Sequence, residues 1–92
     1  MSNLLPHGVK RHLQSSEESA EVICMMLASG KAVSTGEISH VTNLSNYAIM
    51  SRLVRMRDLG IVDMHRMKVS SKWSIPVSFQ EPLKQFMDGG RV

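Results

Sequence analysis

Apolar positions recur along most of this chain at the three- and four-residue spacing of an amphipathic helix. From residue 16 to residue 29 they fall on one broad face, and Gly30 follows where a helix would end. Ser15 and Glu18 have the spacing of a capping box, in which side-chain oxygens accept hydrogen bonds from the amides at a helix start. The pattern predicts a helix over residues 16–29 whose core-facing residues are Ala20, Val22, Ile23, Met26 and Leu27.

A second, shorter helix is predicted from a cap at Ser34 or Thr35 to about Thr42. Its apolar residues Ile38 and Val41 should face inward. Asn43 comes next, and asparagine is the non-glycine residue that best tolerates the left-handed backbone conformation needed for a sharp turn.

A third helix follows this turn directly. Ser45 can cap it by accepting hydrogen bonds from the amides of Tyr47 and Ala48, and Gly60 should stop it after Leu59. Leu44 is expected to fill the junction between the two helices. The predicted buried stripe of the third helix is Ile49, Leu53 and Met56.

Beyond Gly60 the pattern predicts two short strands, at about residues 61–67 and 72–77, with Val69, Ser70 and Ser71 near the turn. Trp73 should face the core, although a stacking platform for single-stranded bases is an alternative. Ser78 and Glu81 form another capping box, which would open a short helix to about Met87 that Gly89 and Gly90 end.

These elements predict a mainly α fold with a small β-hairpin, namely a winged helix-turn-helix with a three-helix core, a wing and a short C-terminal helix. Residues 15–78 would form this domain, and residues 79–92 the C-terminal helix and tail. Residues 1–14 are expected to be an irregular lead-in, because Pro6 and Gly8 interrupt the apolar spacing.

Composition narrows the range of functions. A chain of 92 residues with 42% hydrophobic residues forms one globular domain, too small for an enzyme with a large cleft. No apolar run has membrane-spanning length, and the start is too polar for a secretory signal. Cys24, the single cysteine, cannot form an internal disulfide and is expected to be a small buried side chain. We therefore expect a cytoplasmic protein that is not an enzyme and has no membrane partner.

The net charge of +3 is concentrated on part of the chain. Residues 44–73 carry six cationic side chains against Asp58 and Asp63, a local excess of +4. Such a concentration on one candidate recognition element is typical of a small nucleic-acid-binding domain. The alternative is a solvated helix face and hairpin.

The spacing of Leu44 and Ser45, then Ile49, Leu53 and Met56, then Gly60, Ile61 and Val62 resembles that of bacterial winged-helix transcription regulators. Leu-Ser-Asn-Tyr at residues 44–47, and the basic turn before Lys72 and Trp73, are similar to the small FaeA-like regulators of fimbrial operons. The general part of the resemblance, over residues 35–75, is shared with the MarR, ArsR and Lrp-like groups. The chain departs from the FaeA-like family in its lead-in, its C-terminal helix and its fewer wing arginines.

Both the residues and the resemblance predict a sequence-specific regulator of transcription that binds double-stranded DNA. Its third helix, about residues 45–59, would enter the major groove, and its basic wing, about residues 62–77, would lie on the backbone. Asn46 and Tyr47 are the candidates for base edges, although Tyr47 could instead pack under the wing; Arg52 and Arg55 are candidates for phosphates. The expected DNA-binding residues are Ser45, Asn46, Tyr47, Met50, Ser51, Arg52, Arg55, Arg66, Lys68 and Lys72.

Binding to another protein is the alternative function, either as an interaction module or as an antagonist of another regulator. Met50, Met64 and Met67 could supply an adaptable apolar surface for it. A homodimer is also expected, because one winged helix covers one half-site. The candidate dimer surfaces are Leu4, Leu5, Val9 and Leu13 in the lead-in, and Leu83, Phe86 and Met87 in the C-terminal helix.

No metal site or cofactor site is predicted. The histidines lack the spacing of metal ligands, and Cys24 has no second thiol with which to hold zinc. We expect surface positions for His7, His12, His40 and His65.

Overall fold

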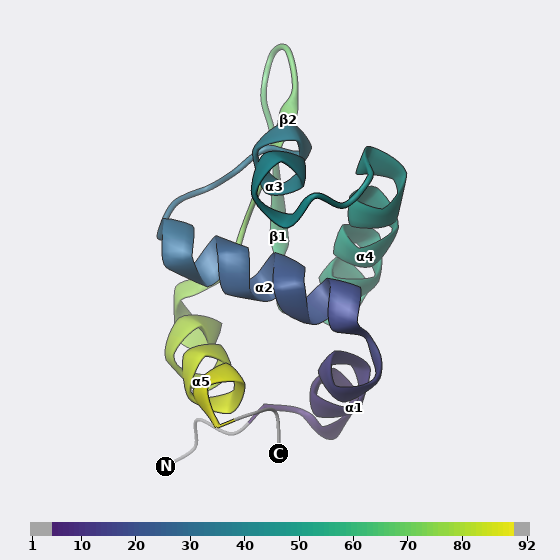
Figure 1. Cartoon of the computed structure of the whole chain (residues 1–92). Coiled ribbons are helices and arrows are strands. Elements are labelled where there is room, and N and C mark those ends of the chain that lie inside the picture. The colour runs from purple at the N-terminus through teal and green to yellow at the C-terminus, as the bar shows by residue number, and fades with distance from the viewer. Residues whose placement is uncertain (1–4, 90–92) are drawn as a thin grey trace.

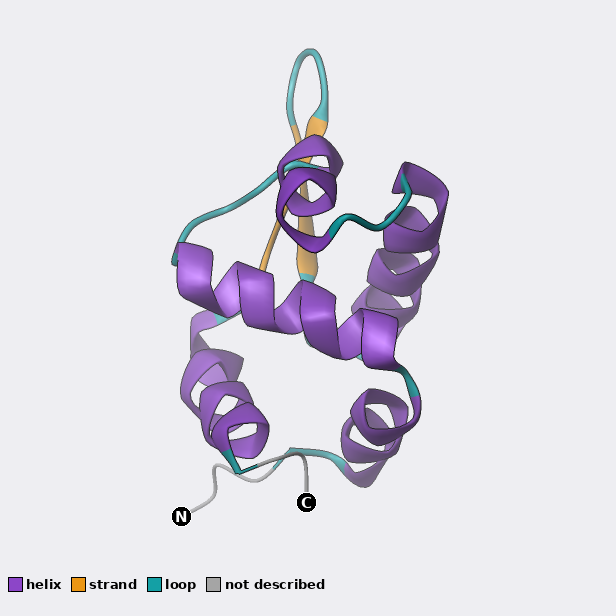
Figure 2. Cartoon of the chain, viewed as in Figure 1, coloured by secondary structure: helices purple, strands orange, loops and turns teal. Residues whose placement is uncertain are grey.

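The computed structural model describes residues 5–89, and the helices and the hairpin of this part are drawn in Figures 1 and 2. The fold is mainly helical with a small antiparallel hairpin, in the winged-helix arrangement that the sequence predicts. In chain order the elements are α1 (His7–Ser15), α2 (Glu17–Ser29), α3 (Thr35–Thr42), α4 (Asn46–Asp58), β1 (Asp63–Arg66), β2 (Ser71–Ser74) and α5 (Val77–Asp88).

Helix α2 is the centre of the molecule and contacts each of the other four helices of the described chain. Figure 1 shows α2 crossing the middle, with α1 and α5 on one side of it and α3, α4 and the hairpin on the other. The buried core cluster takes residues from all five described helices, from β2 and from both loops that flank the hairpin, and Met64 of β1 packs against it. Burial of this surface is the main favourable contribution to folding.

The turn between α3 and α4 has the predicted conformation. Asn43 adopts the left-handed region at φ 67°, and its amide donates to the Ser39 carbonyl at 2.8 Å. The hydroxyl of Ser39 donates to the Leu44 carbonyl at 2.7 Å, and the Leu44 amide donates to Oγ1 of Thr42 at 3.3 Å. These bonds satisfy backbone groups that the helix ends leave without partners, so the turn holds α4 at a fixed angle to α3.

Two predicted helix starts are confirmed. Ser34 caps α3, because its hydroxyl accepts from the Glu37 amide at 3.1 Å while Glu37 accepts from the Ser34 amide at 2.8 Å. That backbone bond, assisted by the positive charges of Lys72 and Lys31, lowers the pKa of Glu37. Ser45 caps α4 by accepting from the Ala48 amide at 3.1 Å.

Both predicted capping boxes are wrong. Ser15 is the last residue of α1, whereas Ser16 has the extended backbone that an N-cap requires and accepts from the Ser19 amide at 3.2 Å. Ser78 lies inside α5, which begins one residue earlier behind Pro76 and has no side-chain cap. Proline has no amide proton to satisfy and its φ is fixed in a range that suits the start of a helix, so Pro76 can precede the first helical residue.

The irregular lead-in expected at residues 1–14 is instead helical from His7 onward. Pro6 is its N-cap, where the missing amide proton costs nothing, so this proline starts the helix. Val9 and Leu13 are buried in the core together with Leu5. They are therefore not an exposed dimer surface, and Leu4 lies outside the described residues.

The C-terminal surface expected for dimerisation is also largely buried. In α5, Leu83 and Phe86 belong to the core and Met87 is half-buried against it. Gly89 ends α5 as predicted, while Gly90 lies outside the described residues. Neither predicted dimer surface is thus available as an exposed apolar face.

The hairpin is shorter than predicted, with paired strands at Asp63–Arg66 and Ser71–Ser74. The flanking residues Ile61, Val62 and Ile75 are buried but not paired in the sheet. Trp73 faces the core as predicted, with 1% of its surface exposed, and its Nε1 has no hydrogen-bond partner among the described residues. A further bridge joins Val33 to Trp73, with N···O distances of 2.9 and 2.7 Å.

Three predicted side-chain environments are wrong. Val41 is exposed, because the short α3 buries Ile38 and turns Val41 outward. Cys24 is exposed because it shares the outer face of α2 with Glu17 and Glu21, at three- and four-residue spacing. His12 is only partly exposed, since its Nε2 lies 2.7 Å from the hydroxyl of the buried Ser19.

Helices α2 and α4 have 13 residues each and are the longest of residues 5–89. None of the helices described is long and apolar enough to cross a bilayer.

Candidate nucleic-acid interface

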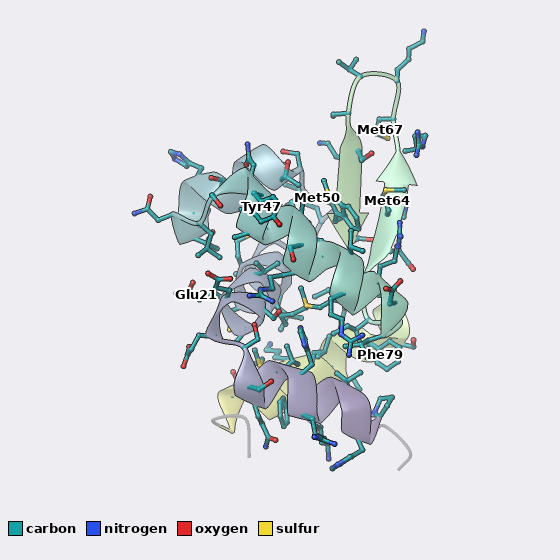
Figure 3. The ribbon with its side chains drawn as sticks, turned by 90° about the vertical axis from the view of Figure 1, so that its right-hand side faces the viewer. Glu21, Tyr47, Met50, Met64, Met67 and Phe79 are labelled. Carbon is teal, nitrogen blue, oxygen red and sulfur yellow. The ribbon has the colours of Figure 1, made fainter. Side chains whose placement is uncertain are left out.

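The outer face of α4 is the centre of the candidate interface. Ile49, Leu53 and Met56 are fully buried and fix one side of the helix against the core, as predicted. The opposite side is therefore held outward, and Figure 3 shows it facing the viewer, with the hairpin above and α1 below. Its first two turns and a half present the exposed residues Asn46, Tyr47, Met50, Ser51 and Val54.

An apolar strip runs along this face. It consists of Tyr47, Met50 and Val54, which are 86%, 42% and 36% exposed. Tyr47 does not pack under the wing, so that alternative is not realised. In Figure 3, Tyr47 and Met50 on α4 lie on the same side of the molecule as Met64 and Met67 of the hairpin. Met67 is also exposed, whereas Met64 is partly buried against the core.

The hairpin carries two of the predicted cations on its exposed outer part. Arg66 follows Met64 by two residues and so lies on the same face of the hairpin, nearer the tip. Lys68 lies in the turn and is exposed. Lys72 is on the opposite face and half-buried, close enough to Glu37 for its charge to lower the pKa of that carboxyl. Arg66 and Lys68 are thus exposed on the outer part of the hairpin, whereas Lys72 lies near Glu37 of α3.

Arg52 is on the side of α4 that faces α2. Its Nε lies 3.1 Å from Oε1 of Glu18, and the two side chains are 39% and 40% exposed. This is the only salt bridge among residues 5–89. The sequence predicted a phosphate contact for Arg52, but its guanidinium is already engaged within the protein.

Arg55 lies one turn further along α4, beside α1. With Arg11, His12, Ser15 and Gly8 it lines an open cleft of about 410 Å³. Burial, and then the charges of Arg55 and Arg52, lower the pKa of His12. The cleft is therefore a positive site lined by two arginines beside an imidazole whose pKa is lowered, and it is suited to an anionic group such as a phosphate.

The structure sorts the ten predicted residues into groups. Ser45 uses its hydroxyl as the cap, and Arg52 and Lys72 point toward other helices. The remaining seven are exposed, namely Asn46, Tyr47, Met50, Ser51 and Arg55 on α4, and Arg66 and Lys68 on the hairpin.

Sequence reasoning missed Arg11 and Val54. Arg11 was overlooked because its segment was expected to be irregular, although the four-residue spacing of Leu5, Val9 and Leu13 indicated a helix. Val54 lies seven residues after Tyr47, which is two helical turns and places both on one face.

The described part of the chain gives little support to a metal site. No group of three histidine, cysteine, aspartate or glutamate side chains within residues 5–89 is arranged to hold a metal ion. Comparison of the chain with protein-family models and with curated proteins found no match.

Proposed function

We propose that this protein is a sequence-specific regulator of transcription that binds double-stranded DNA, with α4 in the major groove and the hairpin on the backbone. The observation that carries the proposal is the outward face of α4, flanked by exposed cations on both sides. Arg66 and Lys68 lie on the hairpin side, and Arg11 and Arg55 lie on the α1 side. No carboxylate among the described residues forms a salt bridge with any of them.

The dimensions of the two partners support this arrangement. An α-helix with its side chains is about 10–12 Å across, and the major groove of B-DNA is about 12 Å wide. A helix seated in that groove has a phosphate backbone on either side. The hairpin lies on one side of α4, and α1, with the cleft that Arg11 and Arg55 line, lies on the other. Each would therefore meet one backbone while α4 meets the bases.

The proposal includes a bacterial, cytoplasmic setting, in which the protein would act on chromosomal DNA. One α4 spans a single half-site, so we expect two copies to occupy a site with two half-sites. Contact between these copies would use a surface other than the buried residues of α1 and α5.

Duplex binding at several salt concentrations tests the proposal, using fragments that the full chain selects from random double-stranded DNA. Replacing Arg66 and Lys68 together with alanine should lower the affinity and reduce the slope of log affinity against log salt by about 1.8, roughly 0.9 per lost phosphate contact. The matched control replaces Lys31 and Lys84, two exposed lysines outside the proposed interface, and should leave the slope unchanged. Failure to select any duplex, or equal slopes for both double variants, would refute the proposal.

A second candidate function is protein binding, and the apolar strip of α4 together with Met67 favours it. Exposed aromatic and methionine side chains are enriched where proteins meet partners. A chain of this kind, either an interaction module or an antagonist of another regulator, would bind its partner with little dependence on salt and would select no duplex.

A further inference from the structure

We infer that α4 recognises A·T base pairs, with its apolar strip in contact with the C5-methyl groups of thymine. This inference rests on the proposed function, because it concerns which bases α4 would contact. It explains a feature that DNA binding alone does not, namely exposed apolar side chains at the centre of a surface flanked by cations.

The composition of the outward face supports this choice of base. Among its residues, Asn46 has an amide that can pair with N6 and N7 of adenine. Met50, Val54 and the ring of Tyr47 offer apolar surface, and thymine is the base with an apolar group in the major groove. Helical spacing places Tyr47, Met50 and Val54 on adjacent turns, so they could contact successive base pairs.

The part of this face that carries the apolar strip, residues 46–54, has no arginine or lysine apart from Arg52. Guanine presents two acceptors, N7 and O6, which arginine or lysine usually contacts. The first cation along α4 is Arg52, which is engaged with Glu18, and the next is Arg55, which lies beside α1. Arg57 is exposed and follows Met50 and Val54 at helical spacing, but it lies in the last turn of α4, beyond the apolar strip. Contact with the apolar strip would remove water from the polar groups of a G·C pair without replacing the hydrogen bonds to that water. This cost would disfavour DNA sites with a G·C pair at these positions.

The first test is the sequence of the duplexes that the full chain selects. The inference predicts A·T pairs at the centre of each half-site. Each thymine of a selected site is then replaced singly by deoxyuridine, which lacks only the C5-methyl group. Loss of one contacted methyl should weaken binding about fourfold, the equivalent of one buried CH₂ group.

Substitutions in the apolar strip identify which residue contacts each thymine methyl group. Met50→Ala should bind more weakly than the wild type and should no longer distinguish thymine from uracil at one position, while Val54→Ala should do the same at another. Both side chains are partly exposed, so circular dichroism should show an unchanged fold. The control, Val77→Ala, changes an exposed apolar residue at the start of α5 and should keep the full discrimination.

The outcomes separate this inference from the proposed function. A selected site rich in G·C, or equal affinity for thymine and uracil at every position, would overturn the inference and leave DNA binding intact. Discrimination that survives in both α4 variants would overturn the assignment to the apolar strip. If no duplex is selected at all, the proposed function itself fails.

Discussion

Arg52 of α4 and Glu18 of α2 form an ion pair, with Nε and Oε1 3.1 Å apart. Both side chains are well exposed, so solvent screening limits the contribution of the pair to stability to about 0–1 kcal/mol. The larger consequence of the pair is that it fixes the direction of the Arg52 side chain. Arg52 and Arg55 are three residues apart on one helix, yet one is directed at the central helix and the other lines the cleft beside α1.

The first prediction follows from this difference. Arg55→Ala should weaken duplex binding and reduce the salt slope by about 0.9, because one phosphate contact is lost. Arg52→Ala should reduce the slope by less than half as much, because Glu18 already compensates its charge. Fluorescence anisotropy with a labelled duplex over a salt series measures both. Equal effects of the two substitutions would contradict the separate roles.

The second prediction concerns α1 as part of the core. Leu13 is fully buried, so Leu13→Ala should lower the free energy of unfolding by about 2–5 kcal/mol. Val69→Ala, at a position in the hairpin turn that is 95% exposed, should change it by less than about 0.5 kcal/mol. Urea denaturation followed by circular dichroism compares the two. If Leu13→Ala were as stable as Val69→Ala, α1 would not be packed as described.

The third prediction tests the turn between α3 and α4. Alanine at position 43 would have to adopt the left-handed conformation at a cost of about 1–2 kcal/mol, whereas glycine adopts it freely. Asn43→Ala should therefore be less stable than the wild type, and Asn43→Gly should be close to it. Thermal unfolding measures the order, and Ser51→Ala on the exposed face of α4 is the control. A glycine variant as unstable as the alanine variant would show that the side chain of Asn43, not its conformation, matters.

The fourth prediction is a loss of stability in mild acid. The pKa of His12 is lowered in the folded chain, first by burial and then by Arg55 and Arg52, so the unfolded chain binds the proton more readily. The contribution of His12 to stability should be complete at pH values well above its ordinary pKa of 6.5. It should decline as the pH falls through that value and level off below the lower pKa of the folded state.

Urea denaturation between about pH 8 and about pH 5, the range in which histidine titrates, measures this loss. His12→Gln keeps a side chain that can hydrogen-bond to Ser19 but does not titrate, so its stability should depend less on pH. His7→Gln, at an exposed position, should retain the dependence of the wild type. An unchanged pH profile in His12→Gln would exclude His12 as the cause.

Local signals in the sequence were sufficient for the three-helix core. Asn43 between two capped helices and the stripe of Ile49, Leu53 and Met56 each depend on neighbours within one or two turns. Trp73 was placed by strand alternation, which is equally local. Such features can be predicted because the interactions that decide them are close in sequence.

The positions that sequence could not assign depend on contacts distant in the chain. Arg52 meets Glu18 across 34 positions, and helical spacing alone could not show which flank of α4 faces α2. The helix at α1 is stable because Val9 and Leu13 are buried against the core, which outweighs the poor helix propensity of Gly8. The candidate site was therefore predicted along α4, including Arg55, whereas Arg11 on α1 was missed.

Because of the bridge between Val33 and Trp73, the base of the hairpin is held by more backbone hydrogen bonds than its turn. At its base, β2 is bonded to β1 on one edge and to Val33 on the other, while the turn is closed by a 2.8 Å bond from the Met67 amide to the Ser70 carbonyl. The base should accordingly exchange its amide hydrogens slowly and the turn quickly. The same bonds join Trp73 to Val33, which directly precedes Ser34, the N-cap of α3, so the base of the hairpin is tied to the start of that helix.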